Sequence, residues 1–422
     1  FDLPTTEFNL QTPTYRELTK VIMKMKSSAS PCPLDQLSII AFKKCPILRT
    51  YLWKIISFAW DNATFPETWT KGVTILIHKK ESNKDPASFR PITLQPVLSK
   101  VFTSVIRNRI FSFVQKNNFI ENTLQKGFWE KMSGSIELTE PVLENHHILA
   151  HVFCIIASLY EDYSTSIATD DYVTAPIKVS RGVLQGDSLS PLLFNLVVNT
   201  LINTIKQDKL NCIGYVYDGC IPPKHWMQFA DDTAIVTSLE SDNQHLINAF
   251  SKWSSWAGLI IRVDKCKSFG MKKVNTRNKQ YQPYLTVNNE RIPPIGEDDQ
   301  MTYLGKDFNF GMSCEHIKNE LVREIDHYLE KINMLPLHPL QKIQICQKYV
   351  FSKIKWRFSI YDLTETWIAQ NLDNRFNKFY RHWLQIPING NITHLFLPNT
   401  KLGFNLNEVK SIYKACKLTV RR

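Results

Sequence analysis

The spacing of hydrophobic residues changes twice along the chain and predicts three successive regions. In the first region apolar side chains recur at helical intervals, and the predicted helices cover about 15–26, 34–44 and 48–60. A mixed region follows, with a strand over 72–77, a long amphipathic helix from Val97 and an apolar helix over about 192–205. From residue 315 onward the spacing is helical again. Helices, mixed elements and helices in this order predict an α+β fold with helical flanks.

Two hairpins are predicted within the mixed region. The first spans about 226–237 and carries two adjacent aspartates at its tip. The second pairs 259–263 with 267–271 across a turn that contains Lys265. Both predictions rest on short hydrophobic runs separated by polar turn residues.

The balance of charge favours a polyanionic partner. The chain has 51 Lys and Arg against 39 Asp and Glu, a net charge of +12, and residues 310–422 hold 17 basic and 9 acidic side chains. A basic excess is a feature of many proteins that bind nucleic acid. Because the excess follows helical patterns, we expect it on helix surfaces rather than in a tail.

Composition excludes several classes of protein. No apolar run approaches the roughly eighteen residues that cross a bilayer, and no signal-peptide pattern opens the chain. The nine cysteines include no C-x-x-C pair, which argues against a zinc ribbon and predicts reduced thiols. We therefore expect a protein of the nucleus or cytoplasm, neither secreted nor membrane-spanning, with its oligomeric state left open. The chain starts with Phe1 rather than methionine, which predicts a fragment or a trimmed product.

Three Asp-Asp pairs occur, and one of them is flanked by hydrophobic strands. Asp231-Asp232 lies at the tip of the first predicted hairpin, whereas the pairs at 170–171 and 298–299 lack such flanks. Two adjacent anions repel each other unless a cation neutralises them, and carboxylates are ligands that Mg²⁺ prefers. The alternative for each pair is a solvated turn.

A second candidate metal site is formed by two histidines. His147 and His151 would share one face of a helix, at a spacing that can bind a metal. No acidic general base lies between them, unlike the H-E-x-x-H pattern of zinc enzymes. Ordinary histidines on a helix surface are the alternative.

Several motifs follow one another in a fixed order. They are Phe89-Arg90-Pro91-Ile92, the string R-G-V-L-Q-G-D-S-L-S-P-L-L-F at 181–194, F-A-D-D at 229–232, and Tyr303-Leu304-Gly305. This order closely resembles the reverse transcriptase domain of non-LTR (LINE-type) retrotransposons, and the long string is its most specific part. The resemblance implies a right-hand polymerase of fingers, palm and thumb. It divides the chain into an N-terminal helical extension (1–68), fingers and palm (69–305), and a basic helical thumb region (306–422).

The resemblance also implies roles for individual residues. Asp231 and Asp232 match catalytic aspartates that bind Mg²⁺ or Mn²⁺, and Lys265 matches a lysine proposed to protonate the leaving pyrophosphate. The positions that match the nucleotide-binding segments are Lys79, Arg90, Gln185 and Gly186. The turn that grips the primer is matched by Tyr303, Leu304 and Gly305. For Lys79 and Arg90, a solvated surface position is the alternative.

One element of the family pattern has no counterpart in the sequence. In the family, a strand before the long string ends in the aspartate that is the third metal ligand. We expect an internal deletion of this strand near 137–145. The acidic residues nearby, none of them in the family's pattern, are Glu137, Glu140, Glu144, Asp170 and Asp171.

The resemblance implies an RNA-directed DNA polymerase. Its partners would be an RNA template, a DNA primer and deoxynucleoside triphosphates, with nucleotides added to the primer 3′-hydroxyl. The alternative is a catalytically dead, nucleic-acid-binding remnant of such an element. Because the third metal-binding aspartate is missing, we expect this chain to be inactive as a polymerase.

Overall fold

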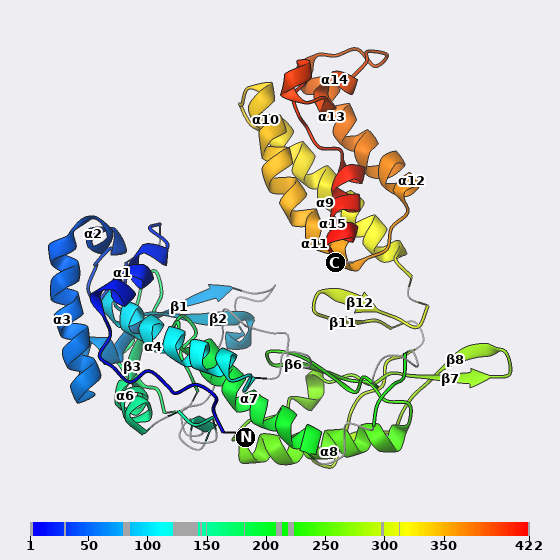
Figure 1. Ribbon diagram of the computed structural model, residues 1–422. Helices are drawn as coiled ribbons and strands as arrows, with labels where there is room; N and C mark the ends of the chain where they lie inside the picture. The colour runs from blue at the N-terminus through cyan, green and yellow to red at the C-terminus, as the bar shows by residue number, and fades with distance from the viewer. Residues whose placement is uncertain are drawn as a thin grey trace. The chain divides into compact units, whose positions relative to one another are not determined.

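The computed structural model describes most of the chain, in two compact units. The described residues are 3–28, 31–78, 85–120, 142–143, 146–148, 150–180, 182–207, 213–217, 223–296, 299–311 and 313–420. The first unit comprises residues 1–266 and 284–292, and the second comprises 267–283 and 293–422. The mixed α+β class is confirmed, whereas the predicted boundaries after residues 68 and 305 stay a prediction (Figure 1).

The first unit begins with three helices, as the sequence predicted. They are α1 (Tyr15–Lys24), α2 (Ile39–Lys44) and α3 (Pro46–Asn62). Helix α1 is capped by Thr14, whose hydroxyl accepts a hydrogen bond from the backbone N of Glu17. Helix α2 is shorter than predicted because Ser38 caps it, accepting from the N of Ile40, so that the helix begins only at Ile39.

A four-stranded sheet follows the helices. Its strands are β1 (Lys71–His78), β2 (Phe89–Leu94), β3 (Ser164–Ala168) and β4 (Ile177–Lys178), in the order β2-β1-β3-β4. Strand β1 runs antiparallel to β2 and parallel to β3. The hydroxyl of Thr74 lies 3.0 Å from that of Thr93 and 2.8 Å from that of Thr165, so hydrogen bonds between side chains join the adjacent strands β2, β1 and β3. Short 3-10 turns precede β1 and β2, at Glu67–Thr70 and Pro86–Ser88.

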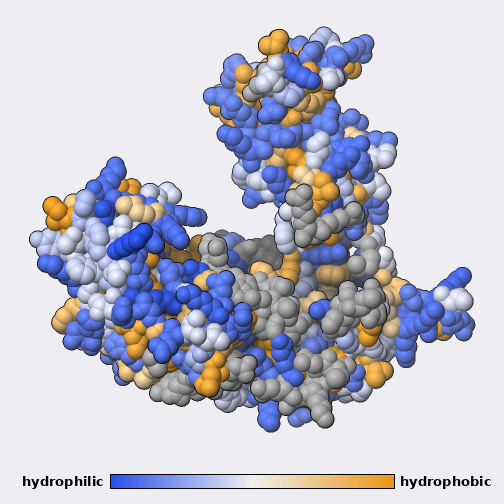
Figure 2. All heavy atoms as spheres, in the orientation of Figure 1, coloured by the Kyte–Doolittle hydropathy of each residue, from blue (hydrophilic) through white to orange (hydrophobic). Residues whose placement is uncertain are grey.

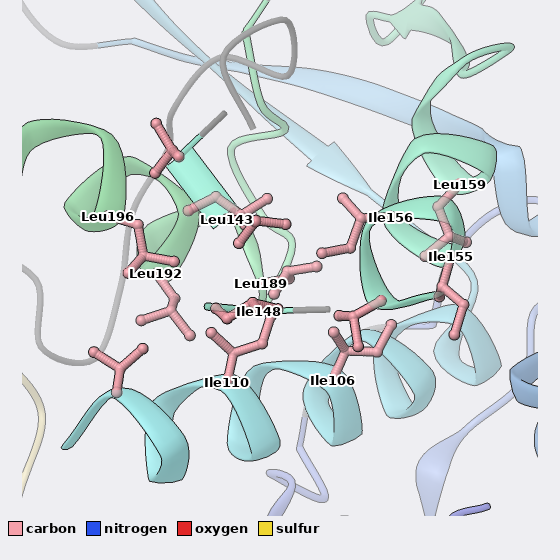
Figure 3. Packing of buried hydrophobic residues seen from close by; sticks show 14 of the residues in the cluster. Ile106, Ile110, Leu143, Ile148, Ile155, Ile156, Leu159, Leu189, Leu192 and Leu196 are labelled. Carbon is pink, nitrogen blue, oxygen red and sulfur yellow. The ribbon is translucent and has the colours of Figure 1, made fainter. Parts of the chain in front are cut away.

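Three further helices contribute much of the main core of the first unit. These are α4 (Val97–Lys116), α6 (Ala150–Tyr160) and α7 (Ser190–Gln207). Figure 3 shows Ile106 and Ile110 of α4 in one cluster with Ile155 and Ile156 of α6 and Leu192 of α7. Each fully buried side chain of this size contributes about 1.5–3 kcal/mol. The predicted helices at Val97 and 192–205 are therefore confirmed. Both pack in the core with apolar residues of the motif at 181–194.

Helix α8 (Glu240–Trp256) completes the first unit. Its Trp253 donates a hydrogen bond to the hydroxyl of Thr200 on α7, 2.9 Å away. The chain leaves α8 through Gly258, which has a positive φ of 62°. Two short strands, β9 (Thr286–Val287) and β10 (Glu290–Arg291), pair with each other. Val287 of β9 belongs to a small separate hydrophobic cluster with Ile247 of α8.

The second unit contains two hairpins and a helical bundle. The hairpins are β7 (Gly270–Val274) with β8 (Arg277–Tyr281), and β11 (Met301–Tyr303) with β12 (Lys306–Phe308). The helical elements are α9 (Glu315–Met334), α10 (Pro339–Ile345), η5 (Cys346–Val350), α11 (Phe351–Ile360), α12 (Glu365–Ile368), η6 (Ala369–Asp373), α13 (Asn374–Leu384), α14 (Thr393–Phe396), η7 (Asn399–Lys401) and α15 (Val409–Val420). Hydrophilic residues form much of the surface of this bundle seen in Figure 2.

The predicted hairpin at 259–271 is wrong. Residues 259–262 form no strand, 263–265 form a 3-10 turn (η4), and β7 begins only at Gly270 and pairs with β8. The guanidinium of Arg262 donates two hydrogen bonds to the carboxylate of Asp264, at 2.8 and 2.6 Å. This ion pair between Arg262 and Asp264 spans the start of the 3-10 turn, where the sequence had predicted the end of a strand. The apolar Ile260, which the prediction had placed in a strand, is 89% exposed.

No helix in the described residues is both long enough and apolar enough to cross a membrane.

Candidate active site

The Asp-Asp pair lies where the first predicted hairpin placed it. Strand β5 (Trp226–Phe229) pairs with β6 (Asp232–Ile235), and the register joins Phe229 to Asp232. Ala230 and Asp231 therefore form the whole connection, with Ala230 buried at a positive φ of 58°. The hairpin and the position of both carboxyl groups at its tip are thus confirmed.

Buried side chains of β5 form hydrogen bonds that lead to the tip of the hairpin. The indole N of Trp226 donates a hydrogen bond to the Oε1 of Gln228, and the Nε2 of Gln228 donates one to the carbonyl O of Ala230. Each of these hydrogen bonds is 3.0 Å long. Trp226 and Gln228 are buried, as expected for alternate residues on the inner face of a strand. This chain of hydrogen bonds connects the core to the residue that precedes Asp231.

The two carboxyl groups are exposed and carry like charge. The pKa of Asp232 is raised, first because neighbouring protein displaces water from its carboxyl and then because Asp231 is negative. A divalent cation would relieve this repulsion, and two carboxylates suit one Mg²⁺ that keeps several waters. Within the described part of the chain, no group of three acidic, histidine or cysteine side chains is placed to hold a metal.

The turn between 182 and 190 is built around a buried acid. Asp187 is 5% exposed, and its carboxylate accepts hydrogen bonds from the hydroxyls of Thr103 (2.6 Å) and Tyr160 (2.8 Å) and from the N of Ser188 (2.6 Å). Burial raises the pKa of Asp187, and these donors oppose the rise. The acid therefore ties the turn to α4 and α6. Sequence reasoning gave this residue no role, although its place inside the long motif was a signal.

The same turn rests against strand β2. The N of Thr93 donates a hydrogen bond, 2.7 Å long, to the carbonyl O of Gln185. Gly186 has a φ of 131°, and a Cβ there would lie 2.3 Å from the carbonyl O of Thr93. The structure thus brings Gln185 and Gly186 against the strand that also carries Arg90, and both Gln185 and Arg90 are exposed. Lys79 lies outside the described residues.

Two other predicted elements are formed as turns. Lys265 is exposed at the end of the 3-10 turn η4 in the first unit. In the second unit, Leu304 (φ 50°) and Gly305 (φ 76°) make the two-residue connection between β11 and β12 after Tyr303. Two consecutive positive φ angles are the geometry of tight hairpin turns. A Cβ on Gly305 would lie 3.0 Å from the indole N of Trp356.

The predicted pairing of His147 and His151 on one helix face is wrong. His147 has a φ of 56° and precedes α6, whereas His151 lies inside α6 with its ring 5.9 Å from that of Trp60. The neighbouring His146 is buried, its Nδ1 lies 2.6 Å from the carbonyl O of Val142, and burial lowers its pKa to about 4. These contacts assign His146 and His151 to packing.

Comparisons with known proteins agree with the motifs. Residues 135–308 match the reverse transcriptase (RNA-dependent DNA polymerase) family. The chain is 23% identical over 385 residues to the Pol polyprotein of the type-2 retrotransposable element R2DM of Drosophila melanogaster, covering 82% of this chain and 35% of that protein. It is 23% identical over 380 residues to the Pol polyprotein of element R2 of Nasonia vitripennis, covering 82% and 36%.

A third relative comes from another mobile element. The RNA-directed DNA polymerase of the element jockey of Drosophila melanogaster is 22% identical over 261 residues, covering 51% of this chain and 27% of that protein. The chain spans about a third of the length of the R2 proteins it matches. The family match begins at residue 135 and does not test the predicted deletion of a strand, which stays a prediction. Residues 135–308 therefore match the reverse transcriptase family, and the chain is similar to proteins of the retrotransposons R2 and jockey.

Proposed function

We propose that this chain is the polymerase region of a non-LTR retrotransposon protein and binds a primed RNA template with deoxynucleoside triphosphates. The observation that carries the proposal is the Asp231-Asp232 pair, held at the tip of a tight hairpin by hydrogen bonds from the core. Two unneutralised carboxylates at an exposed tip suit chemistry on phosphates, which needs bound cations.

The proposed reaction is attack of the primer 3′-hydroxyl on the α-phosphorus of the nucleotide, with release of pyrophosphate. Asp231 and Asp232 would hold Mg²⁺ or Mn²⁺. When bound, the metal ion would neutralise negative charge on the phosphates. The Gln185–Gly186 turn and Arg90 would contact the incoming nucleotide, together with Lys79. Lys265 would donate a proton to pyrophosphate, and Tyr303, Leu304 and Gly305 would position the primer. In this arrangement 69–305 form fingers and palm, and 306–422 form the thumb.

A second candidate function is nucleic-acid binding without polymerisation. In the described residues β5 and β6 form a sheet of two strands, and a third metal-binding side chain is not among their neighbours. Two carboxylates fit one ion, whereas a pair of ions about 3.5–4 Å apart needs ligands that bridge them. Misplacement by about 1 Å can cost on the order of a hundredfold in rate. These points favour a chain that binds but does not extend a primer.

Primer extension on an RNA template tests the proposal. We expect no extension by the purified chain, and measurable extension by a version with a family strand grafted between Thr139 and His146. The graft should act through Asp231, so Asp231→Asn in the grafted chain should abolish extension. Robust extension by the ungrafted chain, lost on Asp231→Asn, would instead mean that a third carboxylate exists, and Glu137, Glu140 and Glu144 would be tested for it. A grafted chain that folds and binds primer–template but does not extend it would contradict the polymerase assignment.

The basic C-terminal region offers a separate prediction about nucleic-acid binding. Of its aromatic residues, Tyr380 and Trp383 are buried in the core and Trp367 is half-buried, whereas Trp356 is 57% exposed. Lys353 and Lys355 are exposed beside Trp356 on α11. Such a surface could stack bases while its cations contact phosphates.

We expect Trp356→Ala to weaken binding of a primer–template by about 1–3 kcal/mol without lowering stability. Trp383→Ala, the matched control, should lower the free energy of unfolding by about 3–5 kcal/mol because it empties part of the core. Filter binding between roughly 50 and 200 mM salt measures the first effect, and affinity should fall steeply over that range. Affinity independent of salt would contradict a phosphate-contacting surface.

A further inference from the structure

The hairpin of β7 and β8 is an exposed ribbon of unusual charge. From Gly270 to Tyr281 the hairpin contains four Lys or Arg and no Asp or Glu. Residues 271–279 are all exposed, so both faces of the outer hairpin are open to solvent. Figure 1 shows the two strands as a narrow ribbon, and Figure 2 shows this ribbon largely in the colour of hydrophilic residues. None of the other proposed roles uses it.

The strand register sorts these cations onto one face. Lys272 pairs with Lys279, and Val274 pairs with Arg277, so the alternation of side chains puts all three cations on the same side of the ribbon. Lys273 lies on the opposite side, paired with Asn278. We call the side with Lys272, Arg277 and Lys279 the cationic face.

The cationic face is electrostatically unfavourable in the isolated chain. Like charges directly opposite each other destabilise a strand pair, and Lys272 and Lys279 are such a pair. Among the described residues no ion pair involves Lys272, Arg277 or Lys279. The ammonium of Lys272 lies 4.7 Å from the centre of the Tyr281 ring, a cation–π contact that adds no negative charge to the face. A polyanion bound to this face would remove the repulsion.

The base of the ribbon is attached on its other side. Gln280, which faces away from the cationic face, donates hydrogen bonds to the carbonyl O of Ile295 (2.8 Å) and of Gly296 (3.1 Å). Just before β7, the N of Ser268 donates to the carbonyl O of Pro293, and its own carbonyl O accepts from the N of Ile295. The hairpin is thus anchored at its base while its cationic face stays open.

We propose that the β7–β8 hairpin binds duplex DNA by placing its cationic face against the phosphates of the major groove. The major groove of B-form DNA, about 12 Å wide, admits a two-stranded ribbon, whereas the major groove of duplex RNA is too deep and narrow. The partner is therefore duplex DNA rather than duplex RNA. This site goes beyond the proposed polymerase function, because it needs neither a primer end nor a nucleotide.

The test uses the full chain and a duplex DNA closed by a loop at each end, which offers no primer terminus. The variant Lys272→Gln/Arg277→Gln/Lys279→Gln should bind at least about tenfold more weakly near 100 mM salt. Its salt slope should fall by about 0.9 for each lost phosphate contact. Because the substitutions remove like-charge repulsion, the thermal unfolding temperature should not fall. Binding to a closed duplex RNA should change much less than binding to DNA.

Two matched variants distinguish an effect of the cationic face from an effect of net charge alone. Lys272→Arg/Lys279→Arg keeps the cations and should bind as the parent chain does, and Lys273→Gln removes one cation from the opposite face with little effect. Equal weakening by Lys273→Gln and Lys279→Gln would overturn the proposal, as would unchanged DNA affinity in the triple variant. Equal losses for DNA and RNA would overturn the groove assignment. Because the closed duplex cannot be extended, these results are independent of whether the chain polymerises.

Discussion

Replacing both Asp231 and Asp232 by asparagine should abolish the paramagnetic relaxation of water protons that Mn²⁺ bound to this chain produces. The two carboxylates are adjacent, exposed and held at the end of a hairpin whose tip is hydrogen-bonded to the core. Asparagine keeps nearly the same shape but removes both charges, and a neutral amide pair cannot replace two anions as ligands of a hard cation. The expected result is a titration that matches free Mn²⁺.

The control is the other Asp-Asp pair in the described residues. Asp170 and Asp171 are also exposed, and they too join two antiparallel segments, β3 and β4, where the N of Thr169 donates to the carbonyl O of Tyr172. Unlike Asp231 and Asp232, they do not belong to the F-A-D-D motif. The variant Asp170→Asn/Asp171→Asn makes the same change in net charge and should leave the relaxation signal intact. An unchanged signal in the Asp231→Asn/Asp232→Asn variant would show that the hairpin pair is only a solvated turn.

The pKa of Asp232 adds a pH dependence to this expectation. Because this pKa is raised in the folded chain, protons compete with Mn²⁺ from a higher pH than at an ordinary aspartate. Affinity should therefore weaken earlier as the pH falls. For stability the sign is opposite to that of a salt-bridged acid, since ionisation of Asp232 disfavours the folded state as the pH rises through its pKa. The asparagine variant should thus be at least as stable as the parent at neutral pH, which thermal unfolding can check.

Substitution of Gly186 by alanine should destabilise the fold and displace the turn that carries Gln185. At a φ of 131°, an L residue is strained, and its Cβ would lie 2.3 Å from the carbonyl O of Thr93. The close approach involves backbone, which cannot swing aside as a side chain can. Backbone strain and overpacking together should lower the free energy of unfolding by about 2–5 kcal/mol. If this turn contacts the incoming nucleotide, the Gly186→Ala variant should also lose nucleotide binding.

Gly182 provides the matched control in the same turn. It also has a positive φ, 82°, but among the described residues no atom lies within 4 Å of the position that a Cβ would take. Gly182→Ala should therefore cost only the backbone preference, about 1–2 kcal/mol. Denaturant unfolding of both variants measures the difference between them. Equal losses in the two variants would mean that the contact with Thr93 contributes nothing.

The sequence by itself determined most of the local elements and the resemblance to a family. Helices such as α4 and α9 follow from apolar residues at helical spacing, a signal contained within a few turns of chain. The β5–β6 hairpin followed from two hydrophobic strands around a polar tip, because such a hairpin closes within ten residues. The ordered motifs predicted kinship with non-LTR reverse transcriptases, which the comparisons support.

Only the tertiary structure decided the roles that depend on distant partners. Asp187 reads as an ordinary turn residue in sequence, but contacts from Thr103 and Tyr160 make it the buried anchor of its turn. In the same way, nothing local distinguishes the exposed Trp356 from the buried Trp383. The register of β7 with β8 put three cations on one face, in place of the hairpin that the local pattern predicted nearby. Burial and strand register are set by contacts between distant parts of the chain, whereas spacing records only each element's own periodicity.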